Sequence, residues 1–173
     1  MRCFIAINLP NEFQKEVEKI QKQLPSFIEK KTKSEKLHLT LKFLGEINKE
    51  RIELVKNELR KIKFKKFITE AGEIGFFDNN LRGVVWIHLK NCEELQKQVD
   101  ESLKNLFPKE KRFMGHLTIA RVRRIKNDTA FFNKLLAIKI PEIKFLVNNF
   151  KLKKSKLGRP GPIYETIESY MLK

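Results

Sequence analysis

The tripeptide His-Leu-Thr occurs twice in this chain, which has only three histidines. The first copy is His38-Leu39-Thr40 and the second is His116-Leu117-Thr118. Each copy lies in a short segment where apolar and polar residues alternate, a pattern typical of a half-buried β-strand. The repeat therefore predicts two similar strands, and with them a fold built from two related halves.

Alternation within a strand also predicts which side chains share a face. His38, Thr40 and Lys42 are expected to project to one side, with the leucines between them on the other. The same rule puts His116 beside Thr118. Two such strands side by side would offer two proton-transfer groups and two hydrogen-bond donors to one small anion.

Strands and helices alternate along the rest of the chain. Turn residues at Asp78-Asn79-Asn80 predict a hairpin between strands over 64–77 and 82–90. Further strands are expected over 2–9, 36–44, 113–122, 141–153 and 162–172, and helices over 11–24, 52–62, 92–106 and 127–138. This order predicts an α+β fold with two pseudo-symmetric lobes, in which central antiparallel strands form a cleft and helices lie outside. Residues 1–173 are expected to form a single domain of two intertwined lobes.

The charge balance indicates a polyanionic partner. Lysine and arginine number 37 against 21 aspartates and glutamates, a formal net charge of +16. Such a surface attracts nucleic acid, although a merely solvated lysine-rich surface is the alternative.

The two cysteines, Cys3 and Cys92, have neither the spacing of a disulfide framework nor that of a metal site. A reducing cytoplasm is therefore expected. No apolar run suits a secretory segment or a membrane span, and a monomer is the default expectation.

The two histidine motifs resemble the paired signatures of the two-histidine (2H) phosphoesterases. The motifs are His38-Leu39-Thr40-Leu41 and His116-Leu117-Thr118-Ile119. The opening residues 1–10, the extended segment 37–45 and the tail around Gly161, Pro162 and Tyr164 are similar to the LigT-like branch of that superfamily. This branch comprises RNA 2′,3′-cyclic phosphodiesterases, historically called 2′-5′ RNA ligases. One departure is Gly115, which stands where the branch commonly has proline.

The resemblance implies metal-independent hydrolysis of a terminal 2′,3′-cyclic phosphate to a 2′-phosphate, without a cofactor. It implies that His38 is the acid and His116 the base, with Thr40 and Thr118 donating hydrogen bonds to the phosphate. The expected substrates are RNA ends, among them tRNA fragments, or small nucleotide cyclic phosphates.

Two cations are further candidates for the phosphate. Arg121 corresponds by resemblance to a family arginine, yet strict alternation puts it on the face opposite His116, so a bulge or a strand end is required. A structural ion pair is the alternative for this arginine. Lys42 passes the alternation test, and a solvated lysine is the alternative there.

Other functions remain open from the residues alone. A metal-dependent phosphoesterase would need three or more closely spaced ligands, which the motifs do not supply. A non-catalytic RNA-binding module would use the charge and the cleft without turnover. RNA ligation is the reverse of ring opening, with a 5′-hydroxyl in place of water. His88 lacks the motif and shares a predicted face with Trp86, which favours a structural role.

Overall fold

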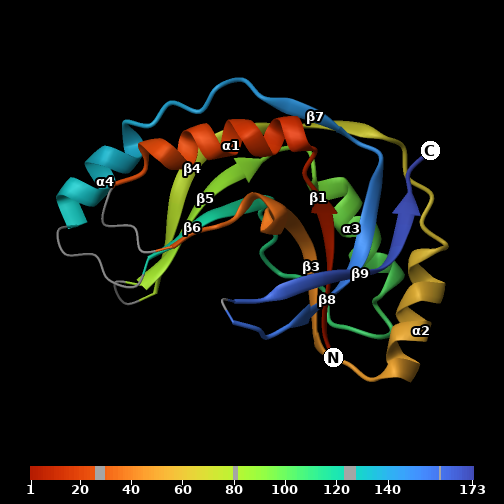
Figure 1. Ribbon diagram of the computed structural model, residues 1–173. Coiled ribbons are helices and arrows are strands. Elements are labelled where there is room, and N and C mark those ends of the chain that lie inside the picture. Colours follow the sequence, from red (N-terminus) through yellow and green to blue (C-terminus); the bar gives the residue numbers. More distant parts are fainter. Residues whose placement is uncertain (26–29, 80–81, 123–127, 160) are drawn as a thin grey trace.

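The computed structural model describes residues 1–25, 30–79, 82–122, 128–159 and 161–173. Within them the strands form one hydrogen-bonded sheet in the order β7-β4-β5-β6-β3-β1-β8-β9, and the short β2 pairs with β6 (Figure 1). Neighbouring strands run antiparallel throughout this part of the chain. The prediction of an α+β fold is confirmed.

Apart from the short β2, the elements follow in the order strand, helix, strand, helix, strand, twice over, and β8 and β9 come last. Their bounds are β1 Arg2–Asn8, α1 Asn11–Gln23, β2 Lys30–Lys31, a 3-10 turn η1 Ser34–Lys36, β3 His38–Glu46, α2 Lys49–Leu59, β4 Phe67–Asn79, β5 Arg82–Leu89, α3 Glu93–Ser102, β6 His116–Val122, α4 Asp128–Leu136, β7 Lys144–Val147, β8 Asn149–Lys156 and β9 Ile163–Met171. The predicted hairpin is present as β4 and β5. Asn80 of its turn and position 127, the expected start of the last helix, lie outside the described residues.

The sheet is symmetric about the junction of β3 and β6. We call β3, β1, β8 and β9 the first half-sheet, and β6, β5, β4 and β7 the second half-sheet. The two meet through a single residue pair, Leu39 with Leu117. The two histidine strands are therefore direct neighbours, and each leads outward into its own half-sheet.

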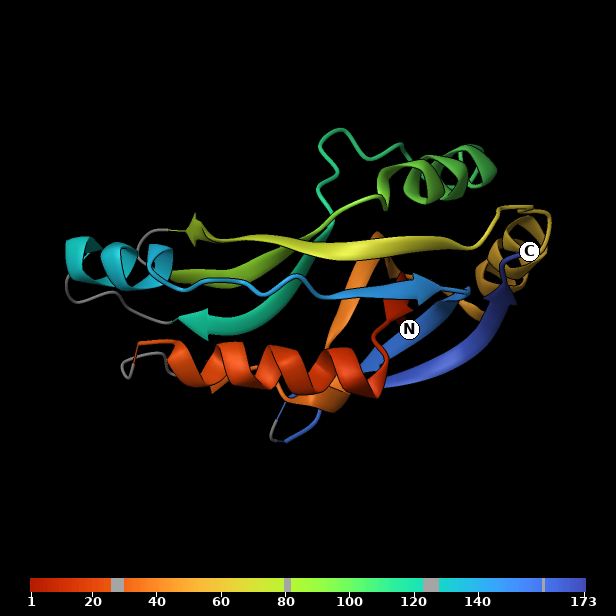
Figure 2. The ribbon, with the colours of Figure 1, turned by 90° about the horizontal axis from the view of Figure 1, so that it is seen from above.

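The helices cross between the halves. α1 follows β1 but packs on the second half-sheet, where Phe13 contacts Phe145 of β7. α3 follows β5 but lies against β3 of the first half-sheet. In Figure 2, α1 (orange) lies along the bottom of the view and α3 (green) lies at the upper right, so the two helices cover different parts of the sheet. Each half is thus completed by a helix from the other half of the sequence.

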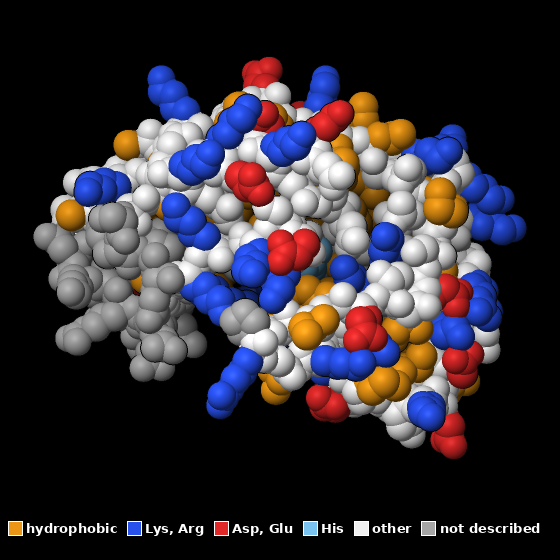
Figure 3. All heavy atoms as spheres, viewed as in Figure 1, with side chains coloured by type: hydrophobic (Ala, Val, Ile, Leu, Met, Phe, Trp, Pro, Cys, Tyr) orange, Lys and Arg blue, Asp and Glu red, His pale blue; other side chains and the backbone are white. Residues whose placement is uncertain are grey.

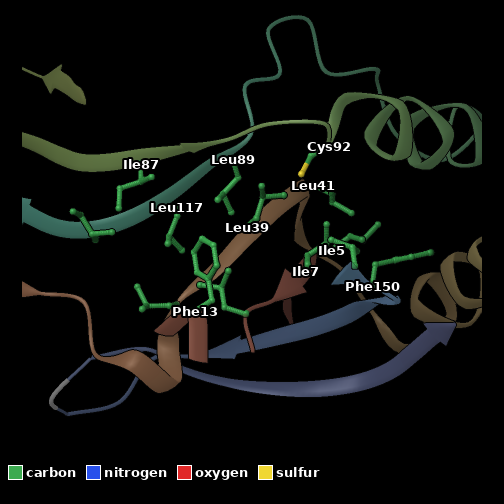
Figure 4. Packing of buried hydrophobic residues seen from close by; sticks show 14 of the residues in the cluster. Ile5, Ile7, Phe13, Leu39, Leu41, Ile87, Leu89, Cys92, Leu117 and Phe150 are labelled. Atoms are coloured by element: carbon green, nitrogen blue, oxygen red, sulfur yellow. The ribbon is translucent and has the colours of Figure 1, made fainter. Parts of the chain in front are cut away.

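The core lies between the helices and one face of the sheet. Alternate strand residues such as Ile5, Leu39, Ile87 and Leu117 are fully buried there and pack together (Figure 4). Burial of such side chains contributes roughly 1.5–3 kcal/mol each, so this face anchors the strands. The other face is left to the polar residues between them.

The late strand expected over 141–153 is two strands, so that prediction is wrong. β7 pairs with β4 at one edge of the sheet, whereas β8 pairs with β1 in the other half. The chain leaves one half-sheet at Val147 and enters the other at Asn149. A continuous extended pattern does not reveal that the strand changes partners on the way.

No helix among the described residues is long and apolar enough to cross a membrane.

Candidate active site

The two histidine motifs line one pocket. It has a volume of about 220 Å³, and we call it the histidine pocket. Its walls come from β1, β3, β6, β8, β9, the segment before β3, and two residues that lie between β8 and β9. The lining residues are Arg2, Cys3, Phe4, Thr32, Lys36, His38, Thr40, Phe43, His116, Thr118, Ser155, Leu157, Pro162 and Tyr164. Figure 3 shows a histidine side chain in a hollow of this face with lysine and arginine side chains around it.

The strand pairing explains how the motifs come together. Since Leu39 pairs with Leu117 in an antiparallel sense, His38 lies across from Thr118 and Thr40 lies across from His116. Each imidazole therefore faces the hydroxyl of the other motif. The predicted grouping of these four side chains agrees with this geometry.

Both imidazoles are fixed in the same way. Nδ1 of His38 lies 2.8 Å from the carbonyl oxygen of Lys36, and Nδ1 of His116 lies 2.9 Å from that of Met114. A carbonyl oxygen only accepts, so each Nδ1 carries a proton and donates it. Nε2 of each ring is then the atom that gains or loses a proton.

The two rings have aromatic neighbours. His38 lies 5.0 Å from the ring of Phe4 and 4.9 Å from that of Tyr164, measured between ring centres. His116 lies 5.1 Å from the ring of Phe77, edge to face. These contacts limit the orientations that each imidazole can adopt.

The environment of His38 opposes its protonation. Its pKa is lowered to about 4, chiefly by burial, although the hydrogen bond to the Lys36 carbonyl raises it. The nearby charges of Lys153, His116 and Arg121 lower the pKa further. His38 is therefore uncharged at neutral pH in the free protein.

A β-bulge in each histidine strand decides which later residues reach the pocket. In β3, Ile5 pairs with Lys42 and the next residue, Ala6, pairs with Thr40, so Leu41 is an extra residue. In β6, Ile119 is the extra residue in the same place, and the burial patterns of 38–44 and 116–122 are identical. Beyond each bulge the two faces are exchanged.

The bulge in β6 brings Arg121 to the face of His116 and Thr118, as the sequence required of it. The side chain is exposed and lines a second pocket beside the histidine pocket. It makes no ion pair with any described residue, so the alternative of a structural ion pair has no support there.

The prediction that Lys42 contacts the phosphate is wrong, because the bulge in β3 turns this side chain into the core. Lys42 is 5 % exposed and forms an ion pair with Asp100 of α3. Its Nζ also donates to the carbonyl oxygen of Pro108, 2.7 Å away. Phe43 takes its place on the pocket wall.

Sequence reasoning missed Phe43 and Lys153. The second motif could have indicated the position of Phe43. Its adjacent apolar residues Ile119 and Ala120 break the alternation, and because the two motifs are repeats, the same break is expected in β3. Lys153 lies on β8 opposite Phe4 and donates to Oδ1 of Asn8 at 3.0 Å. It is 6 % exposed, and burial lowers its pKa. Nothing in the lysine-rich run 151–156 distinguishes it.

Gly115 is explained by a close approach of two strands. A Cβ atom at this position would lie 2.4 Å from the carbonyl oxygen of Leu89 in β5. The Gly115 carbonyl accepts from the Leu89 amide at 2.8 Å. The residue before His116 is thus held against β5, and only glycine fits.

His88 lies beside His116 on β5, as its backbone pairing shows. Its Nδ1 is 3.3 Å from a carboxylate oxygen of Glu73. In the part of the chain that the structure describes, no three His, Cys, Asp or Glu side chains gather closely enough to hold a metal ion.

Comparison with known proteins agrees with this arrangement. The sequence model of the family LigT like Phosphoesterase matches residues 7–86 and 89–164. An RNA 2′,3′-cyclic phosphodiesterase of Methanocaldococcus jannaschii is 37% identical, over 98% of this chain and 100% of that protein. One from Archaeoglobus fulgidus is 33% identical, over 98% and 99%.

Solved structures share the fold. TT0787 of Thermus thermophilus superposes with a TM-score of 0.82 at 23% identity, covering 99% of this chain and 97% of that one. E. coli LigT complexed with 3′-AMP gives a TM-score of 0.81 at 22% identity, covering 99% and 98%. The resemblance that the motifs indicated is confirmed, and the chain belongs to the LigT-like phosphoesterase family.

Proposed function

We propose that this protein hydrolyses the 2′,3′-cyclic phosphate at an RNA end to a 2′-phosphate by metal-independent acid-base catalysis. The observation that carries the proposal is the pair of equivalent histidines in one pocket, each with Nδ1 bound to a carbonyl and Nε2 available. The two relatives named above bear the name RNA 2′,3′-cyclic phosphodiesterase, which supports the same reaction.

Ring opening requires one proton acceptor and one proton donor. One Nε2 takes a proton from water as the water oxygen bonds to phosphorus, and the other gives a proton to the 3′-oxygen as its bond to phosphorus breaks. The 2′-oxygen keeps its bond, so the product is a 2′-phosphate. Each transfer contributes about 10² to 10⁴ in rate.

The roles implied by the family resemblance are acid for His38 and base for His116. Because the pKa of His38 is about 4 in the free protein, the acid role requires the negative phosphate to raise that pKa on binding. The negative charge of the substrate thus stabilises the protonated form of His38.

Thr40 and Thr118 are proposed to donate hydrogen bonds to the non-bridging oxygens, and Arg121 to contribute positive charge. Such donors stabilise the charge that grows on phosphorus in the transition state. Both threonines line the histidine pocket between the imidazoles. Their substitution should reduce turnover less than loss of a histidine.

We propose that the protein acts as a monomeric single domain on RNA or small nucleotide cyclic phosphates in a reducing cytoplasm. Pairing of β1 with β8 joins the two ends of the sequence, which supports a single unit. A net charge of +16 disfavours self-association. The free, buried thiols of Cys3 and Cys92 suit a reducing compartment.

The test is turnover of an oligoribonucleotide that ends in a 2′,3′-cyclic phosphate. We expect His38→Ala and His116→Ala each to lower kcat by about 10²- to 10⁴-fold with little loss of binding. His88→Ala is the matched control, since this imidazole lies on the next strand outside the pocket, and it should retain turnover. The product should carry its phosphate on the 2′-oxygen, and chelator treatment should leave the rate unchanged.

Three results would contradict the proposal. Binding without turnover would indicate an RNA-binding module. Activity lost to a chelator and restored by added metal would indicate a metal-dependent enzyme. A 3′-phosphate product would show that the 2′-oxygen leaves, which reverses the proposed placement of the acid.

A further inference from the structure

A second pocket adjoins the histidine pocket. It has a volume of about 140 Å³ and is lined by five cationic side chains, Lys30, Lys31, Lys33, Lys36 and Arg121. We call it the lysine pocket. No aspartate or glutamate is among its lining residues, although the chain has 21 of them.

Four of the five cations of the lysine pocket have no acidic partner among the described residues. Within the described residues, Lys31, Lys33, Lys36 and Arg121 form no ion pair. Some lysines elsewhere on the surface do have acidic partners, as Lys154 and Lys156 have in Glu165. Like charges that converge without a partner repel one another, which a bound anion would relieve.

Two of these ammonium groups converge on one glycine. The position of a Cβ atom on Gly161 would lie 3.3 Å from Nζ of Lys30 and 4.0 Å from Nζ of Lys36. The φ of Gly161 is +142°, a conformation that other residues rarely adopt. The turn at Gly161 therefore leaves space at the point where the two charges meet.

The lysine pocket shares walls with the histidine pocket. Thr32, Lys36, Pro162 and Tyr164 line both. Because the two pockets share these residues, two anions bound in them would be near neighbours. Two consecutive phosphates of an RNA chain, one nucleotide apart, could therefore occupy the two pockets.

From this juxtaposition we infer that the lysine pocket is a second phosphate subsite, which binds the phosphodiester on the 5′ side of the terminal nucleotide while the cyclic phosphate occupies the histidine pocket. The inference rests on the proposed function and adds a substrate class to it. An RNA end carries that second phosphate, whereas a nucleoside 2′,3′-cyclic phosphate with a free 5′-hydroxyl does not. The lysine pocket thus selects RNA ends over mononucleotides.

Three substrates test the subsite. They are adenosine 2′,3′-cyclic phosphate, the dinucleotide ApA with a terminal cyclic phosphate, and the same dinucleotide with an uncharged methylphosphonate linkage. We expect kcat/KM for the charged dinucleotide to exceed that for the other two by on the order of tenfold or more, the usual effect of hydrogen bonds to a charged group.

The variant Lys31→Gln/Lys33→Gln tests the residues. These side chains line the lysine pocket but not the histidine pocket. The double substitution should remove most of the preference for the charged dinucleotide and leave the mononucleotide rate within about twofold, which also shows that the variant folds. Lys65→Gln/Lys66→Gln, in the exposed segment between α2 and β4, removes the same charge elsewhere and should leave the preference intact.

The outcomes separate the two proposals. Equal wild-type rates on all three substrates would overturn the subsite and leave the phosphodiesterase intact. Hydrolysis of none of them would overturn the proposed function itself. An equal loss of preference in the Lys65/Lys66 control would assign the effect to net charge and so reject a localised subsite.

Discussion

At the scale of single residues, His38 is expected to donate a proton, yet its surroundings favour the uncharged ring. Its Nδ1 is fixed by a carbonyl, which leaves Nε2 to act on the substrate, and the rings of Phe4 and Tyr164 shield it from water. Shielding and the neighbouring cation of Lys153 both favour the uncharged imidazole. A proton donor in this position depends on a bound anion.

We therefore predict that His38 titrates near pH 4 in the free protein and at a higher pH when a nucleoside 2′-phosphate is bound. The sign follows from charge: a phosphate beside Nε2 stabilises the imidazolium, so its pKa rises. The ¹⁵N chemical shifts of the imidazole, followed by NMR across about pH 3–9 with and without adenosine 2′-monophosphate, measure both values. Titration near the ordinary histidine value of about 6.5 in the free protein would show that burial does not lower the pKa of His38.

At the scale of elements, each bulge is held by buried polar groups of a crossing helix. Gln21 of α1 donates to the carbonyl oxygens of Ile119, in the β6 bulge, and of Thr32, before β3, both at 2.8 Å. Asp100 of α3 pairs with Lys42, in the β3 bulge, and accepts from the Glu110 amide before β6 at 3.0 Å. Each helix thus ties one bulge to the segment that leads into the other histidine strand.

Breaking the buried pair should destabilise the fold. Burial alone would raise the pKa of Asp100, but hydrogen bonds from Lys42, Gln96 and the Glu110 amide lower it, so the carboxylate is charged in the core. We expect Asp100→Leu, which leaves the Lys42 ammonium buried and unpaired, to lower the free energy of unfolding by about 3–5 kcal/mol. The double variant Lys42→Met/Asp100→Leu should recover most of this loss, as measured by urea unfolding at neutral pH. A single variant as stable as wild type would contradict the pairing.

The bulge in β3 also marks where the local sequence ceased to be informative. The strands and helices follow local rules, since alternation, helical spacing and prolines act over a few residues. The apolar residues Leu37, Leu39, Leu41 and Phe43 alternate without a break, so nothing local predicts the bulge at Leu41. It depends on Asp100, which lies 58 residues from Lys42 in the chain. The histidines and threonines precede the bulges, and for that reason alternation placed them correctly while it failed for Lys42.

At the scale of the whole molecule, charge and shape act together. The formal net charge of +16 attracts RNA over long distances, whereas the lysine pocket concentrates five cations next to the histidines. The face shown in Figure 3 carries lysine and arginine side chains around the hollow. The general charge should raise the rate of encounter, and the pockets should fix the position of the RNA end.

Salt should therefore weaken binding of RNA more than binding of a mononucleotide. For the inactive His116→Ala variant, we expect the slope of log affinity against log salt to steepen by about 0.7 for each phosphate that is neutralised. Fluorescence anisotropy of labelled ten-residue RNA and of labelled adenosine 2′-monophosphate, each between about 50 and 500 mM salt, gives the two slopes. Equal slopes would mean that a single phosphate carries all of the electrostatic binding.

The interior position of β1, between β3 and β8, has a consequence for synthesis on the ribosome. β1 is synthesised long before β8, yet one of its two edges is closed only by β8. Until then a row of unpaired amides and carbonyls, flanked by the apolar run from Cys3 to Ile7, stays open to other chains. Nascent protein should accordingly depend on chaperones until β8 has left the ribosome.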